Sequence, residues 1–173
     1  MTLRRMCNSK MANNSFDLDA ALARQFYSSP YEGEDNLGQP ILPRFDAAVQ
    51  LNDYESILVL AVIISLQGDQ FFDRNTNQDQ LSAIKDLIIR KMAILRQLVT
   101  TAKLLYTIEN KLAQHTNLLN AITRANLLEG PYLEHYRQST FTARRNRDDQ
   151  KRRLDYQLDI YRQVQSLLQA QLT

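Results

Sequence analysis

The chain has 173 residues, of which 44% are hydrophobic and 23% are charged, and its formal net charge at pH 7 is +2. These values are typical of one globular domain and exclude a collagen-like or multi-domain protein. A charge this close to neutral does not by itself indicate nucleic-acid binding.

The first 44 residues are predicted to form a flexible N-terminal arm. A short helix is expected over about residues 16–27, and residues 28–44 hold three of the four prolines and two of the four glycines, as a linker does. A helix of this length is marginal alone. We therefore expect Phe16, Leu22 and Phe26 to dock, either on the chain's own core or in a groove of another protein.

The next helix is predicted over about residues 45–67. Residues 57–66 form an apolar run that is too short to span a membrane, which takes about 20 residues. Because the run is apolar all round, we expect a buried core helix; the alternative is a segment that inserts into a membrane on a trigger. Gly68 suits the end of this helix, and residues 69–77 are predicted to be a polar loop.

A long helix is predicted over about residues 78–129, which contain neither proline nor glycine. Two columns at alternating spacings of three and four residues indicate a coiled-coil-like seam. They are Ile84, Lys91, Leu98, Leu105, Leu112 and Leu119, and Leu87, Ile94, Thr101, Ile108, His115 and Ile122. The apolar face is wide up to about residue 105 and narrow beyond it. The apolar helix should therefore pack on the first half, and the second half should extend past that body.

Gly130 and Pro131 predict a helix end and the start of a last helix, over about residues 131–171. Its middle, residues 144–153, has six basic and two acidic residues and no apolar one. In a simple hairpin this stretch faces Ile108 and Leu112, which need apolar partners. The last helix is therefore expected either to break near residues 140–146 or to leave that face to another subunit.

The residues expected at a contact with a second copy or a partner combine the seam with tyrosines of the last helix, because interfaces favour tyrosine. They are Leu105, Ile108, Leu112, Leu119, Ile122, Tyr132, Tyr136 and Tyr161. Core edges favour tyrosine too, so a core position is the alternative for these side chains.

The basic stretch is the best candidate for contacts to an anion or a nucleic acid. Its cations are Arg144, Arg145, Arg147, Lys151, Arg152 and Arg153. The alternative is a solvated helix, in which Asp148 pairs with Arg144 or Arg152 and Asp149 pairs with Arg145 or Arg153 at a spacing of four residues.

Motifs for catalysis and for metal binding are missing from the sequence. It contains no P-loop, no GxGxxG, no GxSxG and no HExxH. His115 is expected to set the register of the seam, and His135 is expected at the surface. The single cysteine, Cys7, excludes an intramolecular disulfide and a cysteine-based zinc site. We predict no enzyme, no cofactor, no metal and no small-molecule substrate.

Together these features predict an all-α protein, a long helical hairpin or small helical bundle with coiled-coil-like seams and a flexible arm. The expected function is a non-enzymatic protein-protein interaction or assembly subunit, whose seams another copy or a partner completes. The alternatives are membrane activity through residues 57–66 and nucleic-acid or phosphate binding through residues 144–153. We expect no transmembrane span and no secretory signal, and a place in the cytoplasm or in a large assembly rather than in mitochondria.

Overall fold

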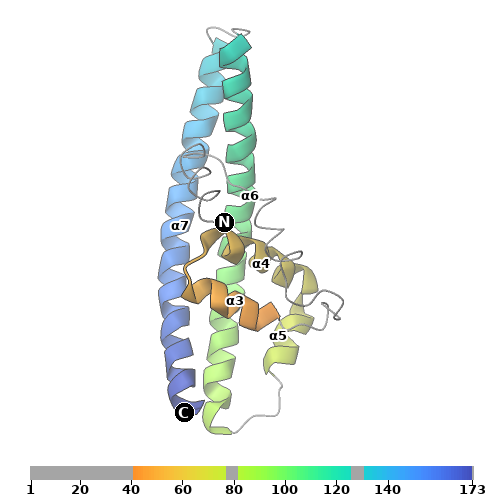
Figure 1. The fold of residues 1–173 in the computed structure, drawn as a ribbon, viewed down its shortest axis with the longest axis vertical. Coiled ribbons are helices and arrows are strands. Elements are labelled where there is room, and N and C mark those ends of the chain that lie inside the picture. Colours follow the sequence, from red (N-terminus) through yellow and green to blue (C-terminus); the bar gives the residue numbers. More distant parts are fainter. Residues whose placement is uncertain (1–40, 77–81, 126–130, 173) are drawn as a thin grey trace.

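The computed structural model describes residues 41–76, 82–125 and 131–172 (Figure 1). These ranges contain five α-helices and no strand, which confirms the all-α prediction. The helices are α3 (Ile41–Gln50), α4 (Tyr54–Gln67), α5 (Asp69–Thr76), α6 (Ser82–Ala125) and α7 (Pro131–Leu172). The predicted helix over residues 16–27, with Phe16, Leu22 and Phe26, lies outside the described residues.

The two long helices form an antiparallel hairpin (Figure 1). With 44 and 42 residues, α6 and α7 are each more than about 60 Å long. The three short helices pack near the first half of α6, so the hairpin continues past them. We call residues 106–125 of α6 and residues 131–153 of α7 the distal half, and the remaining described residues the body.

The hydrophobic core lies in the body, where the short helices meet the hairpin. As predicted, residues 57–66 pack on the first half of α6. Leu58, Leu60 and Ile64 of α4 are fully buried in one cluster with side chains of α6 and α7. The expected cover on every side does not extend to the end of α4, because Leu66 is 79% exposed.

The single helix expected over residues 45–67 is two helices, and the helical region begins before the predicted end of the linker. Residues 41–44 form the first turn of α3, where Pro43 is tolerated because the first N–H groups of a helix have no acceptor within it. At the other end, Asn52 has φ 54°. The Asn52 N–H donates to the Val49 carbonyl at 3.1 Å and the Asp53 N–H to the Ala48 carbonyl at 2.9 Å. These two bonds form a Schellman motif, which ends α3.

The turn between α3 and α4 also begins the second helix. The Asp53 carboxylate accepts hydrogen bonds from the Ser56 backbone N–H at 3.3 Å and from the Ser56 hydroxyl at 2.7 Å. Asp53 is therefore the N-cap of α4. From α7, Arg162 donates to the Val49 carbonyl at 3.1 Å and to Asn52 Oδ1 at 3.3 Å. The turn is thus fixed by its own residues and by the hairpin.

The predicted loop over residues 69–77 is also wrong, since α5 spans Asp69–Thr76. Gly68 does end α4, with φ 67°, and α5 leaves it at an angle of 93° to α4. Phe71 and Phe72 of α5 are buried, and the Arg96 guanidinium lies 4.2 Å from the centre of the Phe72 ring. Burial of two aromatic rings outweighs the low helix propensity of the polar residues around them.

Helix α7 is unbroken through residues 140–146, and a second subunit is not required to cover the facing side chains. Ala143 packs in one cluster with Ile108 and Leu112, which are 7% and 3% exposed. One turn further on, the Arg147 guanidinium forms an ion pair with Glu109 at 3.2 Å. The basic stretch fits the hairpin because a small residue faces the two apolar side chains and a carboxylate faces the arginine.

Candidate functional site

Asp46 of α3 is the centre of a polar cluster inside the body. It forms an ion pair with Lys91 of α6 at 2.8 Å, and it accepts hydrogen bonds from the Tyr161 hydroxyl at 2.5 Å and from Gln165 Nε2 at 3.2 Å, both on α7. We call these four residues the polar clasp. Because it joins α3 to both helices of the hairpin, it holds the body together.

Tyr161 belongs to the core rather than to an interface. It is 1% exposed, and its ring packs edge-on against Phe45 with the ring centres 5.8 Å apart. Burial and then the charge of Asp46 raise the pKa of Tyr161 well above its ordinary value. The hydroxyl therefore stays protonated and donates to Asp46, which is a structural role.

A second polar cluster lies where the body meets the distal half. Glu109 is 8% exposed and pairs with Arg147. The buried Tyr54 hydroxyl lies nearby without a hydrogen bond of normal geometry, and burial and then Glu109 raise the pKa of Tyr54 above its ordinary value. Lys151 lies 5.0 Å from the centre of the Tyr54 ring. The ion pair of Glu109 and Arg147 joins α6 to α7, and the contact of Lys151 with Tyr54 joins α7 to α4.

The predicted anion-contact residues are used in two different ways. Arg147 pairs with Glu109 and with Asp148 at 2.7 Å, and Arg152 pairs with Asp149. These pairs are not the ones that the spacing of four residues predicts. With the described residues, Arg144, Arg145 and Arg153 form no ion pair, and Arg145 and Arg153 are exposed.

The seam residues predicted to meet a partner lie mostly inside the hairpin. Leu105, Ile108, Leu112 and Ile122 are at most 8% exposed. Their burial within one chain removes the reason for expecting a second copy on that seam. Leu119 and Tyr136 are half-buried, and nothing is described of the Tyr132 side chain.

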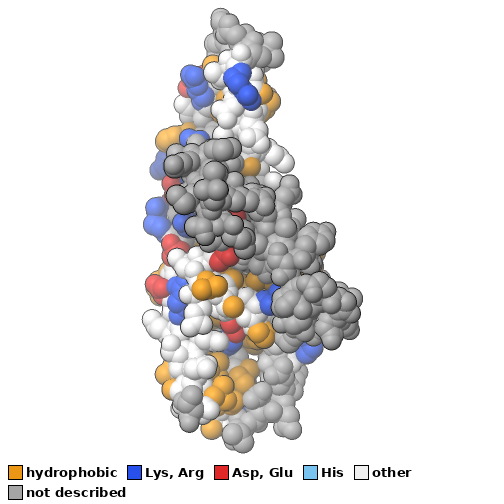
Figure 2. All heavy atoms as spheres, in the orientation of Figure 1, with side chains coloured by type: hydrophobic (Ala, Val, Ile, Leu, Met, Phe, Trp, Pro, Cys, Tyr) orange, Lys and Arg blue, Asp and Glu red, His pale blue; other side chains and the backbone are white. Residues whose placement is uncertain are grey.

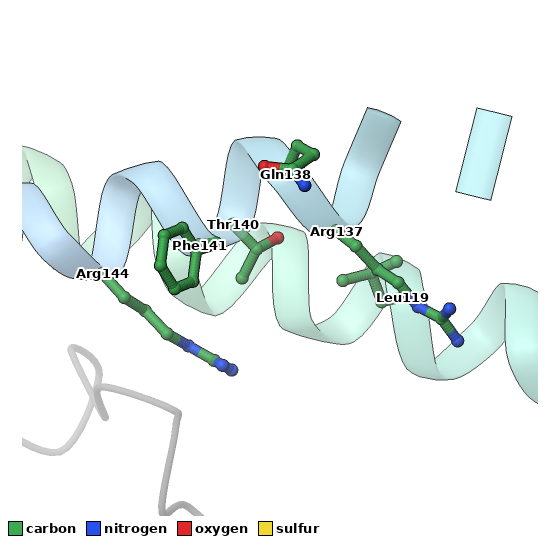
Figure 3. A pocket seen from close by; sticks show the side chains of 6 residues that line it. All are labelled: Leu119, Arg137, Gln138, Thr140, Phe141 and Arg144. Atoms are coloured by element: carbon green, nitrogen blue, oxygen red, sulfur yellow. The ribbon is translucent and has the colours of Figure 1, made fainter. Parts of the chain in front are cut away.

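An open groove lies between the two helices of the distal half (Figure 3). Its volume is about 400 Å³. The lining residues are Leu119 of α6 and Arg137, Gln138, Thr140, Phe141 and Arg144 of α7. Phe141 is 62% exposed, and Leu118, next to Leu119 in the sequence, is 40% exposed. The large apolar side chain of Phe141 therefore remains at the surface beside two arginines.

The charges are divided unevenly between the two parts of the molecule. The distal half contains nine lysines and arginines and four acidic residues, whereas the body contains eight of each. Figure 2 shows lysine and arginine side chains on the visible surface of the distal half. The groove therefore lies in the positively charged part of a molecule whose body is neutral.

Among the described residues, the histidines form no metal site, and the apolar helix α4 does not by itself form a membrane span. In these ranges no group of three or more His, Cys, Asp or Glu is placed to hold a metal ion. His115 is half-buried, with Nδ1 unpaired, and the exposed His135 contacts the ring of Tyr136. None of the described helices alone is long and apolar enough to cross a membrane; only α4 and α5 together pass that test.

Neither the groove nor the polar clasp was predicted from the sequence. The signal for the clasp was Lys91, the one charged residue in a column of apolar ones, which requires a buried carboxylate as partner. The signal for the groove was weaker. Arg137, Phe141 and Arg144 are spaced by four and three residues and share a helix face, but Phe141 resembles an ordinary core position.

In comparisons with known proteins, no family model, no curated protein and no solved structure matches the chain.

Proposed function

We propose that the chain is a non-enzymatic protein-protein interaction or assembly subunit of a larger complex, and that the distal half of the hairpin is its contact surface. The observation that carries this proposal is the exposure of Phe141 at an open groove that Leu119 also lines, outside the core of the body. Grooves with exposed large apolar side chains are typical of contacts with other molecules.

The partner is a different protein rather than a second copy. The seam residues that led us to expect a second copy are buried between α6 and α7. Two copies that met through their distal halves would also bring nine lysines and arginines against nine, with only four acidic residues on each side. We retain the N-terminal arm, with Phe16, Leu22 and Phe26, as a proposed second contact.

The packing makes the two alternative functions less favourable. Residues 57–66 contribute to the centre of the core, so membrane insertion would require the body to open and expose its apolar surface. Within residues 144–153, Arg147 and Arg152 are already paired with carboxylates, which leaves fewer cations for a phosphate backbone.

Site-specific photo-cross-linking of the full chain in its native cells tests the proposal. A photoreactive phenylalanine analogue replaces Phe141 in one variant and Tyr156 in a control. Tyr156 is also an exposed aromatic residue of α7, at 68% exposure, but it lies in the body. We expect a protein adduct of one defined mass from position 141 and a much weaker one from position 156. Equal adducts from both positions, or none from position 141, would contradict the proposal.

A further inference from the structure

The groove of the distal half is lined by two apolar side chains, two arginines, and the polar Gln138 and Thr140. Arg137, Phe141 and Arg144 follow one another along α7, and Leu119 comes from α6 (Figure 3). Arg137 and Arg144 are seven residues apart, so their backbones are separated by two helical turns, about 10.5 Å. The exposed Phe141 ring lies between them.

Neither arginine is neutralised by the described part of the chain. Arg137 and Arg144 form no ion pair or hydrogen bond with any described side chain, whereas Arg147 and Arg152 on the same helix do. A guanidinium can bind a carboxylate through two parallel hydrogen bonds. The two cations therefore remain available to a carboxylate-bearing partner.

We propose that this groove binds an acidic amphipathic helix of the partner protein, an inference that rests on the proposed function and specifies the chemistry of its partner. Two glutamates seven residues apart on such a helix match the spacing of Arg137 and Arg144. Leucine or isoleucine at the positions between them packs on Phe141 and Leu119. This is the helix-in-groove mode of recognition, with charge complementarity at its edges.

The lining fits a protein better than a nucleic acid. A base stacks on aromatic rings, but among the described residues that line the groove Phe141 is the only ring, and Leu119 is aliphatic.

Fluorescence anisotropy with the full chain tests the proposal. The probe is a labelled synthetic peptide about five helical turns long, with leucines along one face and glutamates beside them. A scrambled peptide of the same composition and a single-stranded oligonucleotide serve as competitors. We expect the amphipathic peptide to bind and the scrambled peptide and the oligonucleotide to compete poorly.

Two double variants separate the groove from the overall charge. Arg137→Glu with Arg144→Glu should weaken peptide binding by about tenfold or more. The matched control, Arg90→Glu with Arg153→Glu, changes the net charge equally at exposed arginines outside the groove and should change the affinity by less than about threefold. Circular dichroism should show unchanged helicity in both, because all four residues lie outside the core.

Three results would overturn the proposal: equal losses in the two double variants, no binding of the amphipathic peptide, or tight oligonucleotide binding that is lost on Arg137→Glu with Arg144→Glu. None of these results would test the broader protein-binding function, which the cross-linking from position 141 tests separately. Failure of the acidic-helix inference is therefore distinguishable from failure of the proposed function.

Discussion

Among single residues, Asp46 connects three helices, because one carboxylate satisfies three donors from two other helices. The side chains of Lys91 and Asp46 are 8% and 19% exposed, so their ion pair is largely shielded from water. By contrast, the pair of Asp69 and Arg96 has side chains that are 81% and 51% exposed. The two pairs have similar lengths and differ mainly in burial.

We predict that Asp46→Ala lowers the free energy of unfolding by about 3 kcal/mol, because it leaves the Lys91 ammonium buried without a counter-charge. Asp69→Ala should cost about 1 kcal/mol or less, since its pair is exposed. Urea denaturation measures both. Adding Lys91→Met to Asp46→Ala should recover much of the loss. Equal effects of the two single substitutions would show that the polar clasp does not stabilise the body.

The sequence indicated part of the chemistry of the polar clasp but not its members. Lys91 was visible as a charge in an apolar column, whereas Asp46 lay at the edge of a predicted linker and Tyr161 was assigned to an interface. Which carboxylate meets Lys91 depends on how α3 crosses the hairpin, and no local pattern specifies that crossing. Glu109 and Arg147 were likewise visible only as polar residues, because their pairing depends on the register of α6 against α7.

At the level of the elements, the long helices were predictable and the short ones were not. The absence of proline and glycine over residues 78–129 and the Gly130-Pro131 pair indicated α6 and α7, because these local signals are strong. The division between α3 and α4 depends on Asn52 and Asp53, which resemble ordinary surface residues of a longer helix. Helix α5 depends on the burial of Phe71 and Phe72 against α6, a tertiary effect that its polar sequence does not show.

The junction of α4 and α5 depends on Gly68, which has φ 67° and ψ −152°. Only glycine adopts this conformation readily. A β-carbon at Gly68 would have no heavy atom within 4 Å, so a substitution there measures backbone strain alone. We predict that Gly68→Ala lowers the free energy of unfolding by about 2 kcal/mol.

Urea denaturation checks this prediction too, with Gln70→Ala at an exposed site of α5 as the control. The control should stay within about 0.5 kcal/mol of the wild type. A Gly68→Ala variant as stable as the wild type would mean that the chain passes from α4 to α5 in another conformation.

For the whole molecule, the sequence predicted the hairpin and its extension past a compact body, but not how the hairpin closes. The expectation of a second chain came from placing residues 144–153 opposite Ile108 and Leu112. The register of α7 brings Ala143 to those two side chains instead. The structure therefore buries the seam within one chain and leaves Phe141 exposed at the groove of the distal half.

The solution mass of the full chain, measured by light scattering at a low and a high concentration, distinguishes a chain that binds a different protein from one that assembles with itself. We predict a monomer of 20.1 kDa at both concentrations, because the hairpin buries its own seam and the distal halves repel each other. A defined oligomer at both concentrations would contradict this prediction. An oligomer that is lost in a Leu118→Ser and Phe141→Ser double variant would mean that copies of the chain meet through the distal half, and one that is retained would mean that they meet through another surface.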